Sequence, residues 1–289
     1  MTKQAFNSVS VLIPCYNRAN HIGQVVQAIK NQTYPPDEII VVDDASTDNS
    51  VEVLKHLPIR LLRHEQNRGP SVARNTALKA ASGDIVLYVD ADAYADSRLI
   101  AVLLQAFQRF SHLSLGGIGG RGIESHICTV YDRWRALHAK QDFGLRLRDS
   151  VPYLFGLCAS YNRRALLDVG GFDSFFPINA GEDADVGYRL KRAGYQLYYV
   201  PEAIVYHQHA DTKESLKRVQ YNWFYWTYLA KQRSKRHPWT LFAGTMRRLF
   251  MDTLADLVLR QSSELARLDL EIFRVKMAAL RDASRAGRI

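Results

Sequence analysis

The sequence predicts an α/β fold: a mixed, mainly parallel sheet flanked by helices, followed by a C-terminal helical extension. Two observations carry this prediction. Through the first 90 residues, short apolar runs alternate with segments of helical periodicity, which is the pattern of βαβ units. After about residue 211, the 289-residue chain has the character of long helices and shows no strand signal. We therefore expect an α/β domain over residues 1–210 and a basic, aromatic-rich helical extension over 211–289.

The expected elements follow one another in a regular order. In the first part of the chain, the strands are expected at residues 8–13, 38–42, 59–62 and 85–89, and the helices at 19–31, from 46 onward, and at 71–81. In the middle, strands are expected at 115–123, 153–161, 196–200 and 203–207, and helices at 131–140, 163–169 and 181–193. Because ligands of such sheets bind at the carboxyl ends of the strands, functional side chains are expected directly after them.

Composition bounds the class of protein. Hydrophobic residues make up 47% of the chain and aromatic residues 11%, which is ample for a buried core. The three cysteines are widely spaced and form neither a disulfide framework nor a zinc pattern, which suits a reducing compartment. The first residues lack the pattern of a secretory signal, and no apolar run reaches the ~18 residues of a membrane span. We therefore expect a cytoplasmic protein.

The net charge of +9 is concentrated at one end of the chain. Residues 211–289 contain 16 Lys and Arg against 8 Asp and Glu, whereas residues 1–210 contain 22 against 21. A nearly neutral main domain is not expected to bind nucleic acid. The extension has the charge to meet phosphate groups, an anionic membrane surface or an acidic partner.

Two neighbouring strand ends predict a crevice with an aromatic face and a carboxylate pair. The segment 14–18 follows the first strand, and the segment 43–46 follows the second. Tyr16 could stack on a base, and Asp43 could accept a hydrogen bond from a base N–H. The alternative is that the polar residues of the second segment only cap the next helix.

Asp90 and Asp92 follow the fourth strand. In an extended segment, side chains at i and i+2 point to the same face, so the two carboxylates would repel each other without a cation. Carboxylate oxygens suit Mg²⁺ or Mn²⁺, which bind diphosphates and keep coordination positions open for them. The alternative is that both are ordinary turn residues.

Three carboxylates, Glu182, Asp183 and Asp185, open the helix at 181–193. Acidic side chains there favour the helix dipole, which is the structural interpretation. Three within four residues exceed what capping requires, and one of them could act as a general base. Downstream, His207 and His209 have strand spacing, so either could add a nitrogen ligand and favour Mn²⁺; His207 is preferred, and a structural role is the alternative.

In these segments the sequence resembles family 2 glycosyltransferases. The motifs that carry the resemblance lie, in the family's order, at residues 9–18, 39–48, 67–75, 90–92, 170–173 and 182–183. The resemblance covers roughly residues 8–209 and does not extend to 211–289. It implies a Rossmann-like GT-A fold, a nucleoside-diphosphate-sugar donor, of which UDP is the commonest kind, a divalent metal ion and inversion at the anomeric carbon.

The resemblance also assigns roles to nucleotide-binding residues. Tyr16 and Asp43 would hold the base, Arg74 would lie near the nucleotide, and Pro14 and Asn17 belong to the nucleotide loop.

The chemical roles follow in the same way. Asp92 would be the main metal ligand, Asp90 would approach the ribose or the metal, and Asp183 would be the catalytic base. Glu182 would support the acceptor or the metal shell.

Other classes of protein have less support in the sequence. The glycines at 117–122 satisfy G-x-G-x-x-G, the dinucleotide-binding fingerprint. That fingerprint belongs at a first βα turn, whereas these glycines lie in the middle of the chain. They are more simply explained if they let a strand pass close to the sugar or to another backbone. The sequence contains no GxxxxGK[ST] loop, which argues against a P-loop phosphotransferase. A sugar-nucleotide nucleotidyltransferase and a non-catalytic scaffold that binds nucleotide sugar stay as alternatives.

The extension carries two patterns. Residues 221–228 are strongly aromatic and precede Lys231, Arg233, Lys235 and Arg236, which suits a membrane interface or a helix packed on the main domain. A heptad spacing of apolar residues, with Gln261 as the polar exception, suits a homodimer seam or intramolecular helix packing. The apolar residues are Val258, Leu265, Leu268, Ile272, Val275 and Ala279. The acceptor, whether glycan, lipid-linked or protein, is expected to bind near 131–143, 155–161 and the extension.

Overall fold

A computed structural model describes residues 6–235 and 239–286 of the chain. The chain forms two compact units, each assembled from segments that are separated in the sequence. Unit 1 comprises Met1–Ile123, Gln141–Asn179 and Val186–Gln208, and unit 2 comprises Glu124–Lys140, Ala180–Asp185 and His209–Ile289. The separate domains predicted over 1–210 and 211–289 stay a prediction.

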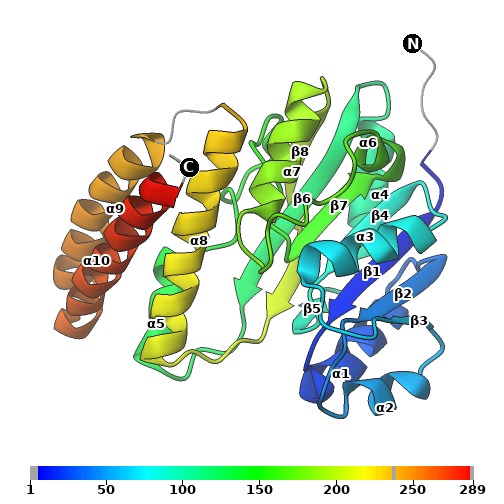
Figure 1. The fold of residues 1–289 in the computed structure, drawn as a ribbon, viewed down its shortest axis with the longest axis horizontal. Coiled ribbons are helices and arrows are strands. Elements are labelled where there is room, and N and C mark those ends of the chain that lie inside the picture. Colours follow the sequence, from blue (N-terminus) through cyan, green and yellow to red (C-terminus); the bar gives the residue numbers. More distant parts are fainter. Residues whose placement is uncertain (1–5, 236–238, 287–289) are drawn as a thin grey trace. The chain divides into compact units, whose positions relative to one another are not determined.

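Unit 1 is built on a mixed, curled eight-stranded sheet with the order β3-β2-β1-β4-β7-β6-β8-β5 (Figure 1). Its strands are β1 (Val9–Cys15), β2 (Glu38–Asp43), β3 (Arg60–Arg63), β4 (Ile85–Val89), β5 (Ala93–Ala95), β6 (Leu115–Glu124), β7 (Cys158–Asn162) and β8 (Gln196–His207). The first four strands pair in parallel, whereas β7 runs antiparallel to β4 and β6, and β5 runs antiparallel to β8. The predicted α/β class is therefore correct, and its parallel part is the N-terminal half.

Apolar cores cover both faces of this sheet. In β1, Val11 and Ile13 belong to one buried cluster and Leu12 belongs to the other, because successive side chains of a strand point to opposite faces. This is why β1, β2 and β4 are continuous apolar runs in the sequence. The same pattern places the polar residues that follow these strands at one edge of the sheet.

The helices of unit 1 are α1 (Ala19–Lys30), α2 (Ser50–Lys55), α3 (Pro70–Ala80), α4 (Leu99–Arg109) and α6 (Arg163–Asp168), and α7 (Glu182–Arg192) runs from unit 2 into unit 1. The helix expected from residue 46 begins only at Ser50, and the strand expected over 153–161 begins at Cys158. The two strands expected at 196–200 and 203–207 form the single strand β8. Helix α4 was not predicted.

The glycine-rich segment is strand β6, and no helix begins at its end as a dinucleotide fingerprint requires. A Cβ at Gly117 would come within 2.6 Å of the Ser160 carbonyl oxygen. A Cβ at Gly120 would come within 2.6 Å of the Cys158 sulfur and would overlap the Ala203 carbonyl. The glycines therefore allow close strand packing, which is one of the two roles expected for them.

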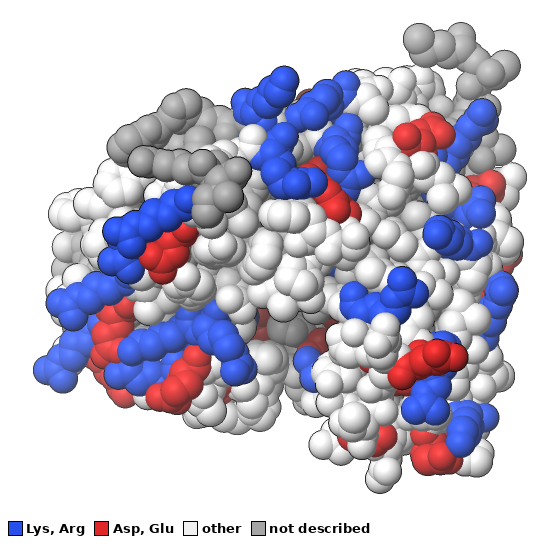
Figure 2. All heavy atoms as spheres, in the orientation of Figure 1, with Lys and Arg blue, Asp and Glu red and all other residues white. Residues whose placement is uncertain are grey.

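Unit 2 is helical and contains α5 (Val130–His138), α8 (Lys213–Arg233), α9 (Trp239–Val258) and α10 (Ser263–Ala286). Its apolar core joins side chains of α5, α8 and α10 around Trp134, Leu216 and Ile272. On the face drawn in Figure 2, Lys and Arg side chains are interspersed with fewer Asp and Glu over these helices. Within the described residues, no helix combines the length and hydropathy that crossing a bilayer requires.

Both patterns of the extension take part in packing within unit 2. The aromatic segment 221–228 lies in α8 with half-buried side chains, and Tyr221 donates a hydrogen bond to Asp282 at 2.9 Å. Of the heptad residues, Leu265, Leu268 and Ile272 are buried in the core, whereas Val258 and Gln261 precede α10. Arg236 lies outside the described residues. This packing is the intramolecular alternative to a dimer seam.

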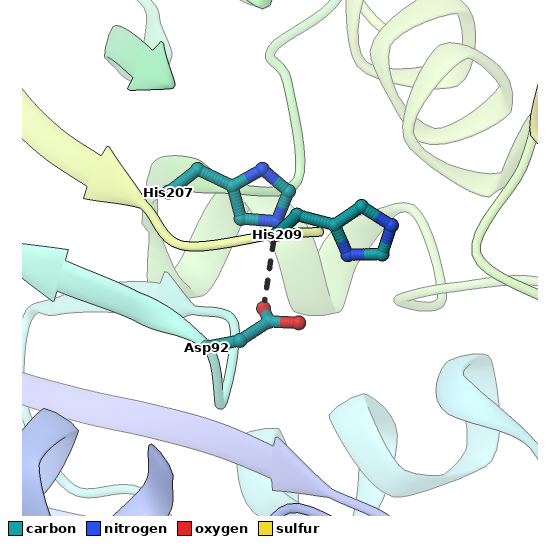
Figure 3. Close-up of side chains that lie close together, drawn as sticks. All are labelled: Asp92, His207 and His209. Carbon is teal, nitrogen blue, oxygen red and sulfur yellow. Dashed lines mark ion pairs between the residues drawn. The ribbon is translucent and has the colours of Figure 1, made fainter. Parts of the chain in front are cut away.

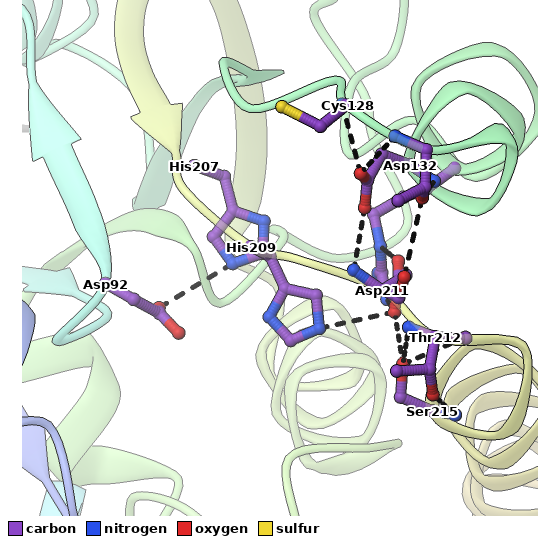
Figure 4. Close-up of polar contacts among 10 residues, drawn as sticks. Asp92, Cys128, Asp132, His207, His209, Asp211, Thr212 and Ser215 are labelled. Atoms are coloured by element: carbon purple, nitrogen blue, oxygen red, sulfur yellow. Dashed lines mark hydrogen bonds and ion pairs between the residues drawn. The ribbon is translucent and has the colours of Figure 1, made fainter.

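A buried ion pair anchors α5 to the segment that leads into α8 (Figure 4). The Asp211 carboxylate accepts two hydrogen bonds from Arg135, one of them at 2.9 Å, and a third from the Ser215 hydroxyl at 2.8 Å. The Asp211 amide donates to Asp132, which also completes the capping box of α5 with Thr129. Burial raises the pKa of Asp211, but its hydrogen bonds from His209 and Arg135 and the Arg135 charge outweigh this and hold the pKa far below its usual range.

Arg135→Ala is expected to destabilise unit 2 by about 3–5 kcal/mol, because it leaves the Asp211 carboxylate buried without its cation. The pKa of Asp211 is lower in the folded than in the unfolded state, so the pair contributes its stability above the usual pKa of 3.8 and loses it as the pH falls below that value. Urea denaturation at neutral and acidic pH measures both effects. Arg133→Ala, at an exposed position of the same helix, is the control.

Candidate active site

The loops that follow β1 and β2 are joined by hydrogen bonds at Asn17. Asn17 has a positive φ of 52°, and its amide donates to the Ser46 hydroxyl at 2.9 Å. Its side-chain oxygen accepts a hydrogen bond from the Thr47 amide at 2.8 Å. Pro14, the sixth residue of β1, pairs with Val42 of β2. The two strand ends predicted to be neighbours therefore meet, and Asn17 fixes their relative position.

An exposed aromatic ring and a buried carboxylate occur in these two loops. Tyr16 is 45% exposed, whereas Asp43 is fully buried. One Asp43 oxygen accepts from the Ser46 amide at 3.2 Å and lies 3.4 Å from Arg63 Nε. The other, Oδ1, is buried and has no hydrogen-bond partner among the described residues. An unsatisfied buried acceptor costs about 1–3 kcal/mol, which a donor from a ligand would offset.

The neighbouring Asp44 has a structural role. Its carboxylate accepts hydrogen bonds from His64 Nδ1 at 2.6 Å and from the Gly69 amide at 2.8 Å. These bonds hold the loop that leads into α3. One alternative was that the polar residues after β2 cap the helix that follows. Asp44 does not do so, because its hydrogen-bond partners His64 and Gly69 lie before α3.

Asp90 follows β4 and lies next to a buried guanidinium. Arg74 on α3 is 1% exposed, and its Nη2 lies 3.3 Å from Asp90 Oδ1. The same guanidinium lies over the Phe172 ring at 5.4 Å. Burial raises the pKa of Asp90 above its usual value, Arg74 opposes this shift, and the charge of Asp92 adds to it. The structure thus brings together Arg74, predicted to lie near the nucleotide, and Asp90, predicted to approach the ribose or the metal.

Asp92 faces His207, and the pairing of β5 with β8 explains why (Figure 3). Ala93 is in register with His207, and the Gln208 amide donates to the Asp92 carbonyl at 3.1 Å. The side chains then lie with Asp92 Oδ1 3.6 Å from His207 Nε2. Two ligand atoms at this separation can bind one ion at about 2.1 Å each, the distance typical of small divalent cations. A carboxylate and an imidazole suit Mn²⁺ in particular.

The sequence did not predict the role of Arg18. Its Nε lies 3.2 Å from Asp92 Oδ2, so this carboxylate has a cation on one side and an imidazole on the other. The signal for this pair was present, because Arg18 and Asp92 both follow strands that end at the same edge of the sheet. The sequence alone does not give the distance between Arg18 and Asp92, because that distance depends on the path of the short strand β5.

His209, the second histidine considered as a ligand, begins the last segment of unit 2. There its ring lies 3.4 Å from the Asp211 carboxylate (Figure 4). Ligand histidines commonly give their second nitrogen to a carboxylate, which fixes the ring. The Asp211 carboxylate holds the His209 ring in this way. The ion pair with Asp92 is made by His207.

The three predicted carboxylates open α7, and their burial differs. Glu182 and Asp185 are each 3% exposed, whereas Asp183 is partly exposed. Gly181 precedes them with φ +85°, and a Cβ there would come within 2.8 Å of the Trp226 backbone in α8. This turn therefore requires glycine, and it ties the acidic segment to α8 within unit 2. Of the three carboxylates, Asp183 is the least buried.

In unit 1, residues predicted to bind a nucleotide and a metal ion lie at the carboxyl edge of a mixed, curled sheet. This arrangement is that of a GT-A type of transferase fold. Residues 10–170 match the family model described as "Glycosyl transferase family 2". The chain belongs to glycosyltransferase family 2.

Curated relatives are glycosyltransferases and synthases. The chain is 31% identical to a pre-mycofactocin glycosyltransferase of Mycobacterium tuberculosis, over 70% of this chain and 43% of the relative. It is 24% identical to a poly-beta-1,6-N-acetyl-D-glucosamine synthase of Staphylococcus epidermidis, over 76% of this chain and 54% of the relative. The chain thus spans about half the length of these relatives.

Solved structures share the fold. The mannosyltransferase PcManGT from Pyrobaculum calidifontis, in complex with GDP-Man and Mn²⁺, superposes with a TM-score of 0.60 at 22% identity, over 98% of this chain and 79% of that one. S. aureus TarS 1-349 in complex with UDP gives a TM-score of 0.57 at 18% identity, over 98% and 91%. At these identities the likeness concerns the fold, and it confirms the predicted GT-A architecture.

Proposed function

We propose that this family 2 glycosyltransferase moves a sugar from a nucleoside-diphosphate sugar, with UDP favoured, to a hydroxyl of a glycan, lipid-linked or protein acceptor. The observation that carries the proposal is the buried Asp43 oxygen without a hydrogen-bond partner, beside the loop of the exposed Tyr16. A base that stacks on Tyr16 and donates an N–H to Asp43 would use both features. Complexes of the two structural neighbours with GDP-Man and UDP support this donor class.

The nucleotide-binding roles are distributed over one edge of the sheet. Pro14 and Asn17 shape the loop that carries Tyr16, since Asn17 ties it to the loop after β2. Arg74 would face the nucleotide together with Asp90, whose ionised form it favours. These contacts would hold the donor in place before any bond is broken.

Asp92, with His207 and Asp90, is proposed to hold Mn²⁺ or Mg²⁺. A bound divalent cation supplies charge neutralisation for the departing diphosphate. Asp92 and His207 orient each other, and Arg18 limits the electrostatic cost of the buried Asp92 carboxylate. The neighbour solved with Mn²⁺ supports manganese.

Asp183 is proposed as the general base of a single, inverting displacement. It would take the proton of the acceptor hydroxyl as that oxygen attacks the anomeric carbon and the bond to the diphosphate breaks. Such assistance is typically worth about 10²–10⁴-fold in rate. Glu182, which is buried, would support the acceptor or the metal shell.

A panel of nucleotide sugars tests the proposal. With Mn²⁺ present, we expect one or a few of them to raise the thermal unfolding temperature and to be hydrolysed slowly, and product analysis by NMR should find the anomeric configuration inverted. Stabilisation without hydrolysis or transfer would favour the non-catalytic scaffold. Formation of a nucleotide sugar from a nucleoside triphosphate and a sugar phosphate would favour the nucleotidyltransferase.

We further propose that the enzyme works on the cytoplasmic side of a membrane as a peripheral protein. The net positive charge of the C-terminal extension supports this location. Self-association through the C-terminal helices is the competing use of this region.

A further inference from the structure

Helix α9 carries a set of exposed apolar side chains. The side chains concerned are between 40% and 68% exposed, and they recur at the spacing of one broad helix face: Phe242, Met246, Phe250, Met251, Leu254, Leu257 and Val258. Leu259, directly after the helix, is 79% exposed. We call this set the α9 apolar face. Single exposed apolar residues are ordinary, but a contiguous set of this size marks an interaction surface.

The opposite side of α9 is polar and is the side that packs. Asp256 is fully buried, with Oδ2 3.0 Å from His138 Nε2, and Asp252 lies 3.6 Å from His138 Nδ1. Thr245 is also buried, and its hydroxyl donates to the Leu241 carbonyl at 2.6 Å. The described side chains of the apolar core of unit 2 come from α5, α8 and α10, and α9 packs through these polar contacts and the half-buried Leu241 and Leu249. This arrangement is the reverse of an ordinary surface helix, whose apolar face points inward.

The charges of α9 indicate what covers its apolar face. Arg247 and Arg248 are exposed, whereas both acidic residues of the helix, Asp252 and Asp256, contact His138. Apart from Asp252, whose side chain is 35% exposed beside His138, the charge on the surface of α9 is positive and accompanies large apolar side chains. This combination is that of helices that lie in a bilayer interface, with the apolar face among the acyl chains and cations at anionic headgroups.

We propose that α9 docks unit 2 on an anionic lipid bilayer, with its apolar face inserted at the level of the headgroups. The inference rests on the peripheral membrane location proposed above, which it deepens, and does not depend on the chemistry proposed for unit 1. It changes the segment assigned to the membrane, because the aromatic residues 221–228 lie half-buried in α8. The acceptors best placed for such an enzyme are those presented at a membrane surface.

Vesicle co-sedimentation of the full chain tests the proposal, with phosphatidylcholine vesicles that contain or lack phosphatidylglycerol. We expect the wild type to bind the anionic vesicles at low salt and to be partly released by high salt. Leu254→Glu should weaken this binding by about tenfold or more, because it replaces an inserted apolar side chain with a charge that anionic lipid repels. Leu167→Glu is the matched control: Leu167 is exposed to a similar degree, 40% against 47%, and lies on α6 of unit 1.

Circular dichroism checks that both variants are folded, which is expected because both side chains are exposed. Failure of the wild type to bind anionic vesicles at low salt would overturn the proposal. Equal binding by wild type and Leu254→Glu would also overturn it, since binding would then not use α9. A wild-type dimer that Leu254→Glu dissociates, with no vesicle binding by either, would assign the α9 apolar face to contact between two copies instead.

Discussion

Asp183→Asn is expected to lower sugar transfer by about 10²–10⁴-fold and to leave donor binding largely intact. The substitution keeps the shape of the side chain but removes its ability to accept the acceptor proton. The donor-binding residues are others, so the loss should fall on the rate of transfer rather than on donor affinity. Initial rates with saturating donor and acceptor, together with donor titrations, measure the two quantities separately.

The comparison with Glu182→Gln makes this test specific to one carboxylate. Glu182 precedes Asp183 in the same helical turn but is 3% exposed, whereas Asp183 is partly exposed. Glu182→Gln is therefore expected to act through folding or through the positioning of substrates. Full turnover by Asp183→Asn, or loss of turnover in Glu182→Gln alone, would remove Asp183 from the role of base.

Asp92→Asn is expected to abolish the part of donor affinity that depends on a divalent cation. Asp92 is the carboxylate that lies beside His207, so its loss should exceed the about 10–100-fold effect typical of removing an outer-shell partner of a metal site. Calorimetric titration of donor in the presence of Mn²⁺ and in the presence of a chelator measures the difference. In the variant, the two titrations should agree.

Asp96→Asn is the matched control for this variant. Asp96 follows β5 in the same part of the chain, and its carboxylate lies 3.8 Å from Arg98 rather than near a histidine. Its replacement should leave the metal dependence of donor binding unchanged. Metal-dependent binding that survives in Asp92→Asn would show that Asp92 is not the main ligand.

Much of unit 1 was predictable because its strands are buried on both faces. The strand predicted at 85–89 matches β4, and the ends of β1 and β2 meet as expected. Helix α4 was missed although Leu99, Leu103 and Phe107 recur at helical spacing and are buried, so the signal was present in the sequence. Strand β5 is different: three residues carry no periodicity, and the strand exists because β8 pairs with it.

The candidate site was predictable as a set of residues but not as a geometry. Strand ends and motif order indicate Asp90, Asp92 and His207, whereas the Arg18 contact depends on how β5 runs beside β8. The orientation of α9 could not be read from its pattern, since an amphipathic helix is normally expected to bury its apolar face. Buried partners such as His138, more than 100 positions away in the sequence, determine the opposite orientation.

Release of nucleoside diphosphate from nucleotide sugars is the measurement that tests the central claim most directly. The purified chain is incubated with each donor in Mn²⁺ or in a chelator, with and without Asp92→Asn. The account predicts release from at least one nucleotide sugar that requires the metal ion and is lost in the variant. Absence of release from every nucleotide sugar in the presence of candidate acceptors, or release that neither the chelator nor the Asp92→Asn substitution lowers, would contradict it.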